Sequence, residues 1–418
     1  MDFIIYQSSI IRTDRLSPKE EAMQFPSSDA LNRLPSQFFK ELVQTLKKFE
    51  AKGIDIINLG QGNPDLKTPD HIIDALNTAN KNPIHHKYSP FRGYDTLKNA
   101  VATYYAREYG VELNPETEIA ILPGTKTGLV ELSQCLLNED DVALVPDPGY
   151  PDYLSGIALQ GARPVLMPLK ESNDFLPDLD KILKNDQEDA KLMFLNYPNN
   201  PTSGVATPAF FDEVIAFCKK NKIALCHDFA YHTIQFEGKR AISLMQQPGA
   251  KDVGIELFTL SKAYNMAGFR VGFAVGNKDL ISKLEEIQDH LFVSLSGGIQ
   301  IAAEAALLSS QAEAEKLTAT YERRRNTLIN GLRAIGWEVD APKGTFFCWL
   351  KIPRGFTSMS FSQFLLEHAH VFVAPGSGFG PSGEGYVRVA LLADCERLLE
   401  ACERIQSTRV FNQDKSIL

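Results

Sequence analysis

The sequence predicts an α/β protein in which helices cover both faces of a mostly parallel sheet. Between residues 119 and 277, short apolar runs rich in β-forming residues alternate with amphipathic stretches of helical spacing. This alternation is typical of parallel strands joined by helices. The composition agrees, because 44% of the 418 residues are hydrophobic and 23% are charged, which is average for a globular chain with a large core.

The central elements follow in chain order. Beyond residue 277, leucine and isoleucine recur at steps of four, three and four from Leu280 to Leu291, which predicts an amphipathic helix with Asn277 as its N-cap. The runs expected as strands before it are residues 119–122, 142–145, 192–195, 223–226, 255–260 and 271–275, with helices expected at residues 129–136 and 210–220.

The two ends of the chain differ from this core. A helix at residues 301–308 is expected to lead into a C-terminal α+β unit. Residues 1–25 match none of the patterning, and we interpret them as an N-terminal extension with Met23 as a candidate start. Strands of the C-terminal unit are expected at Val339 and at residues 346–350, 371–374 and 386–391.

Charge and cysteine usage narrow the class of protein. The chain carries 43 Lys and Arg against 52 Asp and Glu, a net charge of −9, which disfavours nucleic acid or an anionic membrane as the main partner. None of the six cysteines forms a Cys-x-x-Cys pair, so no metal site is expected. Because the sequence shows no secretory signal and no apolar run of about 18 residues, a cytoplasmic location is expected.

The segment at residues 259–272 carries two cations with complementary chemistry. Lys262 follows a buried strand, at the edge where open α/β sheets bind ligands. An amine held there in apolar surroundings loses its charge more easily and becomes a better nucleophile, which suits Schiff-base chemistry. Arg270 follows eight residues later, after a glycine, and can return to the same place to bind an anion. Taken alone, Lys262 has the simpler interpretation of a solvated lysine.

Two other strand ends carry polar groups. Asp228 follows the run at 223–226 and can bind a cationic ring nitrogen, and Tyr231 can turn its hydroxyl into the same cleft. Asn200 lies in a loop before a proline, where a side-chain amide can point into a cleft. Alone, each has an ordinary structural interpretation as a turn or core residue, and His227 is expected to be a core histidine.

A fourth strand end offers a phosphate site. Thr125 and Lys126 open a helix directly after Pro-Gly, where free backbone N–H groups and the helix dipole favour an anion. The four turns together offer a phosphate site, an amide, a carboxylate with a phenol, and an amine followed by a guanidinium. This set fits pyridoxal phosphate, which has a phosphate, a ring nitrogen, a ring hydroxyl and an aldehyde.

From about residue 26 to residue 411 the sequence resembles the class I/II aminotransferases of fold type I. The resemblance implies a pyridoxal phosphate enzyme, with a mostly parallel seven-stranded sheet in its large domain and a smaller α+β domain. The implied segments are an N-terminal extension at 1–25, the first part of the small domain at 26–60, the large cofactor-binding domain at 61–310 and the rest of the small domain at 311–418.

The resemblance also implies roles for the motif residues. Lys262 matches the lysine that bonds to the cofactor aldehyde and then moves the substrate proton, and Asp228 matches the partner of the pyridine nitrogen. Tyr231 and Asn200 match the donors to the ring hydroxyl. Lys262, Asp228 and Tyr231 are therefore the expected catalytic residues. The residues that match the phosphate grip are Thr125, Lys126, Thr259, Ser261 and Arg270.

The remaining matches concern the substrate and a second subunit. Tyr150 matches the aromatic residue stacked on the pyridine ring. Arg388 matches the arginine that receives the substrate α-carboxylate, with Gly62 and Asn200 beside it. Tyr88 resembles the tyrosine that reaches the phosphate of the neighbouring subunit, so the resemblance implies a homodimer with shared sites.

One motif, which begins at Asn200, departs from the family's pattern. The family's usual Asn-Pro-Thr-Gly reads Asn-Pro-Thr-Ser-Gly in this sequence, and we interpret Ser203 as an insertion.

A second feature concerns the substrate. Dicarboxylate-specific members bring a second arginine to the substrate from the stretch that matches residues 288–296, and this stretch has no arginine here. An apolar or thioether substrate is therefore favoured. The candidates for aromatic walls of the substrate pocket are Phe38, Phe39, Phe292, Phe346 and Phe347.

Within the family, three strings resemble the methionine-salvage aminotransferases of bacilli, at residues 57–65, 145–153 and 264–268. This resemblance implies conversion of 4-methylthio-2-oxobutanoate to methionine, with glutamine or another amino acid as donor. The alternatives are an N-acetyl- or LL-diaminopimelate-type or a broad aromatic or neutral aminotransferase, and a pyridoxal-phosphate-dependent C–S lyase. A non-catalytic regulator on this fold is not expected, because the residues before the motifs leave no room for a DNA-binding domain.

Overall fold

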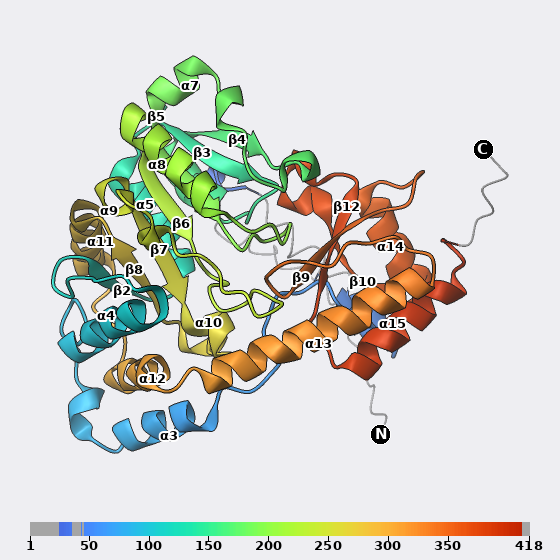
Figure 1. Cartoon of the computed structure of the whole chain (residues 1–418), viewed down its shortest axis with the longest axis horizontal. Helices are drawn as coiled ribbons and strands as arrows, with labels where there is room; N and C mark the ends of the chain where they lie inside the picture. Colours follow the sequence, from blue (N-terminus) through green and yellow to red (C-terminus); the bar gives the residue numbers. More distant parts are fainter. Residues whose placement is uncertain (1–24, 36–42, 44–45, 412–418) are drawn as a thin grey trace, which may run out of the picture.

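The computed structural model describes residues 25–35, 43 and 46–411, and its centre is a seven-stranded sheet (Figure 1). The strand order is β2-β8-β7-β6-β5-β3-β4. β8 runs antiparallel to both of its neighbours, and the other pairs are parallel. The strands are β2 Ile119–Leu122, β3 Val142–Asp147, β4 Arg163–Pro168, β5 Ala190–Asn196, β6 Ala224–Asp228, β7 Gly254–Thr259 and β8 Gly272–Gly276.

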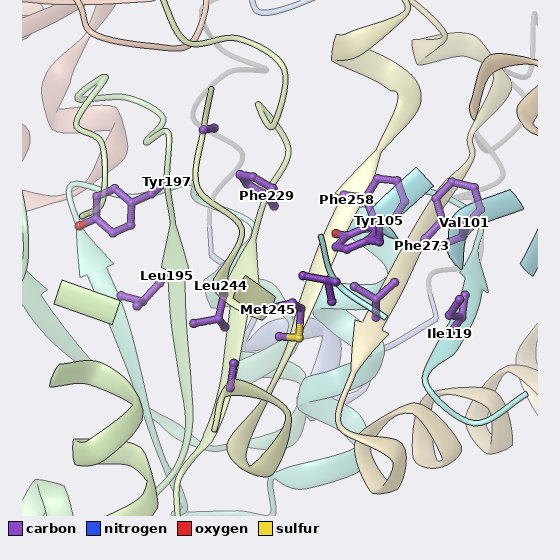
Figure 2. Packing of buried hydrophobic residues seen from close by; sticks show 14 of the residues in the cluster. Val101, Tyr105, Ile119, Leu195, Tyr197, Phe229, Leu244, Met245, Phe258 and Phe273 are labelled. Atoms are coloured by element: carbon purple, nitrogen blue, oxygen red, sulfur yellow. The ribbon is translucent and has the colours of Figure 1, made fainter. Parts of the chain in front are cut away.

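Residues of one strand alternate between two hydrophobic clusters, because the sheet is covered on both faces. Met193 and Leu195 of β5 belong to one cluster, whereas Leu192 and Phe194 belong to the other. Figure 2 shows part of the first cluster, in which the ring centroids of Phe258 and Phe273 lie 4.8 Å apart. The near-continuous apolar runs of the sequence are therefore the buried strands that they predicted.

The helices of this part fall into two layers, one for each cluster. α4 Asp95–Tyr109, α8 Pro208–Asn221 and α12 Gly297–Leu308 contribute to the first cluster, and α5 Thr125–Leu136, α6 Tyr153–Gln160 and α11 Lys278–Leu291 contribute to the second. The Asn277 side chain accepts from the backbone N–H groups of Asp279 and Leu280, which confirms the predicted N-cap. The other helices before residue 310 are α1 Asp29–Asn32, α3 Asp70–Ala79, α7 Lys184–Asp189, α9 Ala250–Val253 and α10 Leu260–Ala263.

A second group of elements lies beside the large sheet, at the right of Figure 1. It contains an antiparallel sheet of order β11-β12-β9 and the parallel pair β1-β10. β1 comes from the N-terminal part of the chain and β10 from the C-terminal part, so the two ends of the described chain fold together. The bounds are β1 Ile57–Asn58, β9 Phe347–Lys351, β10 Val371–Phe372, β11 Ala374–Pro375, β12 Tyr386–Ala390, α13 Ala312–Ala334, α14 Ser358–His368 and α15 Cys395–Ser407.

One expected strand is absent at its predicted place, and several observed elements were not expected, β4 and α13 among them. Val339 is buried but belongs to no strand, because it packs into the second group of elements from a loop. β4 was not predicted, since it is an edge strand with two prolines and mostly exposed residues. The long helix α13 was not predicted either. Its mean hydropathy is low and much of its surface is polar.

The pairing of β1 with β10 joins residues 57–58 to the C-terminal elements, and the division of the chain at residues 60 and 310 remains a proposal. Residues 1–24 of the predicted extension lie outside the described residues, as do Phe38 and Phe39. No helix in the described part of the chain combines the length and the apolar character that crossing a bilayer requires.

Candidate active site

A cavity of about 620 Å³ opens at the carboxyl edge of the large sheet. Its wall combines the ends of β5, β6 and β7, the start of α5, and residues of the second group of elements. The sequence-predicted site residues that line it are Gly62, Thr125, Lys126, Tyr150, Asn200, Asp228, Tyr231, Thr259, Ser261, Lys262, Arg270 and Arg388. Tyr88 is 91% exposed and does not line this cavity.

Lys262 lies one short turn beyond the end of β7. Its Nζ donates to the backbone oxygen of Gly62 at 3.2 Å and lies 5.6 Å from the centre of the Phe346 ring. Burial lowers the pKa of Lys262 to about 8, and the positive charges of Arg388 and Arg270 act in the same direction. About a tenth of this amine is therefore neutral, and nucleophilic, at pH 7, far more than of an ordinary lysine.

Asp228 is the last residue of β6, and its carboxylate is buried. Tyr153 donates to Oδ2 at 2.9 Å, while Oδ1 has no hydrogen-bond partner among the described residues. Burial raises the pKa of Asp228 to about 6, although the Tyr153 hydrogen bond and the nearby His227 oppose this rise. An unsatisfied buried carboxylate oxygen is costly unless a donor meets it, and a protonated ring nitrogen is such a donor.

His227 is the core histidine that the sequence predicts. Its Nδ1 lies 2.8 Å from Glu256 Oε2 and its Nε2 lies 3.0 Å from the backbone oxygen of Tyr197. The ring is fully buried, so these partners hold it beneath the Asp228 end of β6 rather than in the cavity.

The predicted phosphate site lies between the end of β2 and the start of α5. Gly124 has φ +90°, and a Cβ at this position would lie 2.6 Å from Arg270 Nη2, so the glycine lets the guanidinium approach the helix N-terminus. Thr259 accepts from the Ser261 backbone N–H at 3.1 Å and thereby fixes the turn after β7. Lys126 stands at the rim and pairs with Asp152 at 2.9 Å.

Arg388 is buried between two aromatic rings. Its guanidinium carbon lies 4.0 Å from the centre of the Phe347 ring and 4.6 Å from that of Phe379. Nη1 donates to Asn200 Oδ1 at 3.0 Å and Nη2 to the backbone oxygen of Gly60 at 2.8 Å. Burial lowers the pKa of Arg388 to about 10, which still leaves the group protonated at neutral pH.

The backbone conformation of Ser203 bears on the altered Asn-Pro-Thr motif. Ser203 has φ +62°, a conformation that favours glycine, whereas the following Gly204 is not left-handed. Ser203 therefore has the backbone conformation that a glycine adopts without strain. The interpretation of Ser203 as an insertion stays a prediction.

The phenylalanines predicted as aromatic walls of the substrate pocket take different positions in the structure. Phe347 lines the cavity, whereas Phe346 lies behind it against Tyr231 and Lys262. Phe292 is 37% exposed and does not line the cavity. Sequence reasoning missed Tyr153 and Phe379. Neither residue had a usable signal, because Tyr153 meets Asp228 from 75 positions away in the chain and Phe379 reaches the site through tertiary packing alone.

The charges of this wall fit a cofactor with a phosphate. Among the described lining residues, Lys126, Lys262, Arg270 and Arg388 are cations and Asp228 is the one anion. A phosphate dianion beside Gly124 and a ring nitrogen at Asp228 Oδ1 would satisfy both ends of the cavity. The residues present therefore fit pyridoxal phosphate.

Fold and site together define a pyridoxal-phosphate-dependent transferase of fold type I. A profile of the family described as "Aminotransferase class I and II" matches residues 54–405. The chain belongs to this family, and it is a transaminase that uses pyridoxal 5′-phosphate and acts on amino acids and 2-oxo acids.

Individual relatives match nearly the whole chain. The L-glutamine–4-(methylsulfanyl)-2-oxobutanoate aminotransferase of Bacillus subtilis (strain 168) is 54% identical over 395 residues, which cover 94% of this chain and 99% of the relative. An LL-diaminopimelate aminotransferase of Moorella thermoacetica is 43% identical over 376 residues, 90% of this chain and 96% of the relative. The apo structure of BacF from Bacillus subtilis has a TM-score of 0.89 at 49% identity, covering 92% of this chain and 98% of that chain.

Proposed function

We propose that this transaminase forms methionine from 4-methylthio-2-oxobutanoate, with L-glutamine as amino donor. The observation that carries the proposal is the charge distribution of the cavity. Arg388 serves the α-carboxylate, Arg270 serves the phosphate, Lys262 is the reactive amine and Lys126 pairs with Asp152. No further lining cation remains among the described residues for a second carboxylate, so an uncharged substrate side chain is favoured. The name of the 54% identical relative supports the same substrates.

The proposed roles follow from the positions of the side chains. Bound pyridoxal phosphate supplies an electron-withdrawing ring that makes the α-proton of an amino acid removable. Lys262, whose pKa is lowered to about 8, takes this proton and returns it as general base and acid. Asp228 Oδ1, which has no hydrogen-bond partner among the described residues, would accept from the ring nitrogen. Burial raises the pKa of the Tyr231 phenol, so it remains a donor at neutral pH.

Substrate orientation is assigned to Arg388 and its surroundings. The guanidinium is held by Asn200 and Gly60 and by two rings, so its position is fixed before the substrate arrives. A carboxylate bound there places the α-carbon over the Lys262 side of the cavity, and such fixed orientation is a large part of catalysis.

We also propose a homodimer in which Tyr88 reaches the phosphate of the other subunit. The support is that Tyr88 is a large, exposed aromatic residue, with the exposed Ile84 and Phe91 nearby in sequence. Three exposed apolar side chains in so short a stretch are typical of an interface.

The test is a panel of 2-oxo acids presented to the purified holoenzyme with glutamine, followed by kcat/KM for each. We expect 4-methylthio-2-oxobutanoate to exceed oxaloacetate and 2-oxoglutarate by at least about tenfold, since a second buried carboxylate lacks a partner. A preference for dicarboxylic oxo acids would contradict the proposal.

Two control reactions address the alternatives. Release of pyruvate and ammonia from cystathionine without an added oxo acid would indicate a C–S lyase. LL-diaminopimelate carries a distal ammonium group, and Asp228 is the one acid in the described cavity wall. We therefore expect it to be a poor donor, and efficient turnover with it would indicate a diaminopimelate aminotransferase.

A further inference from the structure

The loop that carries Asn200 is rigid and closed on itself. Asn199 donates its backbone N–H to the backbone oxygen of Gly204 at 2.9 Å, and Ser203 donates its own to that of Asn199 at 2.9 Å. Asn199 Oδ1 accepts from the backbone and hydroxyl of Thr202 at 3.0 and 2.7 Å. This loop belongs to the large sheet, because it follows β5 directly.

Ser203 connects this loop to the smaller sheet. Its hydroxyl is buried, with 4% of the residue exposed, and donates to the backbone oxygen of Phe347 at 2.6 Å. β9 is an edge strand. Leu391 donates its backbone N–H to Phe346 oxygen on the inner side, so the Phe347 oxygen points away from the sheet. The serine hydroxyl is thus the nearer of two donors to a buried carbonyl group that has no strand partner, the other being the Thr345 hydroxyl at 3.5 Å.

The two contacts converge on one guanidinium. Asn200 of the loop accepts directly from Arg388, while Ser203 of the same loop holds Phe347, whose ring lies 4.0 Å from the Arg388 guanidinium carbon. A closed ring of contacts therefore runs from Asn200 through Arg388 and Phe347 to Ser203. The serine maintains this contact from a left-handed backbone conformation that a glycine would adopt without strain.

We propose that Ser203 is a positioning residue for substrate carboxylates, acting through Phe347 on Arg388. This inference rests on the proposed role of Arg388 and adds to it a residue outside the cavity wall. Loss of the hydroxyl leaves the Phe347 oxygen with the longer contact to Thr345 at 3.5 Å, so the ring and the guanidinium are held less firmly and sample more orientations. Carboxylate binding weakens, whereas the proton transfer at Lys262 proceeds at its former rate once the substrate is bound.

The test uses Ser203→Ala and Ser203→Gly in the holoenzyme. The glycine variant removes the hydroxyl and also relieves the left-handed strain, so it folds even if the alanine variant does not. We expect KM for both substrates to rise about three- to tenfold in each folded variant, as loss of one buried hydrogen bond implies, with kcat within about twofold. Titration calorimetry with 4-(methylsulfanyl)butanoate, which has neither an amino nor an oxo group, should show an equal loss of affinity.

Two controls separate the possible outcomes. Ser133 is also buried and donates to a backbone oxygen, that of Leu129 at 3.2 Å, but it lies outside the cavity wall, so Ser133→Ala should leave the carboxylate affinity unchanged. Arg388→Gln tests the proposed function itself. If Arg388→Gln weakens carboxylate binding and Ser203→Gly does not, the inference about Ser203 is overturned while the role of Arg388 stands. If neither variant weakens carboxylate binding, the proposed role of Arg388 is overturned, and the inference about Ser203, which rests on it, is overturned as well. A fall in kcat at unchanged KM would also overturn the positioning role.

Discussion

Lys262 combines burial with two neighbouring guanidinium groups, and both effects favour its neutral form. An amine attacks an aldehyde only when neutral, so covalent capture of pyridoxal phosphate by the apoprotein should accelerate as pH rises, with a midpoint near 8. Arg388→Gln removes one positive charge and should move this midpoint to higher pH. The measurement is the rate of capture by stopped-flow absorbance between pH 6.5 and 9.5.

The comparison of variants makes this test specific. Ionisations of the free cofactor are the same for every variant, so the difference between the two midpoints reports on Lys262. Arg163→Gln is a suitable control, because Arg163 lies on edge strand β4 and pairs with Asp186, away from the cavity wall. Equal midpoints for wild type and Arg388→Gln would show that the guanidinium does not act on the amine.

The residues expected to react with or bind ligands were easier to predict from the sequence than the residues that hold them in place. Asp228 ends β6 and Lys262 follows β7, and the carboxyl ends of parallel strands meet at one edge of a sheet, so their convergence could be expected. Arg270 follows Lys262 by eight residues on the same turn. Tyr153 could not be assigned, because a helix-starting tyrosine gives no sign of a carboxylate 75 positions away in the chain. The role of Ser203 required its backbone conformation, which the sequence does not display.

Among the elements, the start of α5 depends on one glycine. Gly124→Ala would place a methyl group 2.6 Å from Arg270 Nη2 and also strain a backbone at φ +90°. Gly110→Ala is the matched control, since its φ is +66° and nothing lies within 4 Å of the added carbon. Gly110→Ala should lower the free energy of unfolding by about 1 kcal/mol. Gly124→Ala should lower it by more, because its backbone at φ +90° and ψ 148° lies outside the left-handed helical region.

The two glycine variants should differ in cofactor affinity. We expect Gly124→Ala to weaken pyridoxal phosphate binding by at least about tenfold, because a displaced guanidinium loses a charge-assisted phosphate contact, while Gly110→Ala retains normal affinity. Fluorescence titration of the apoproteins and urea unfolding measure the two quantities. Equal affinities in the two variants would contradict the inference that Gly124 lets Arg270 reach the phosphate.

Element prediction succeeded where burial was uniform. β2 and the strands of the central sheet were visible as continuous apolar runs, because both of their faces are covered. β4 was missed since only one of its residues is fully buried. α13 was missed because a long helix that packs on one side carries mostly polar residues, and its apolar positions are few in any one window.

At the scale of the whole molecule, the proposed homodimer predicts complementation. A Lys262→Ala chain retains Tyr88, and a Tyr88→Ala chain retains Lys262, so a mixed dimer has one complete site. After unfolding and refolding of an equal mixture, activity should return to about a quarter of the wild-type value, because half of the dimers are mixed and each has one of two sites. Activity no greater than that of the separately refolded Tyr88→Ala protein would contradict shared sites.

The reversed strand β8 has a consequence for how the reactive groups are spaced. Antiparallel neighbours can be joined by a short turn, whereas parallel ones need a crossover, so the chain leaves β7 and re-enters the sheet at the same edge. Lys262 and Arg270 both lie on this one excursion, residues 260–271. The length of this segment sets the distance between the Lys262 amine and the Arg270 guanidinium. An extra residue inserted in the segment should change that distance, whereas one inserted at the opposite edge of the sheet should not.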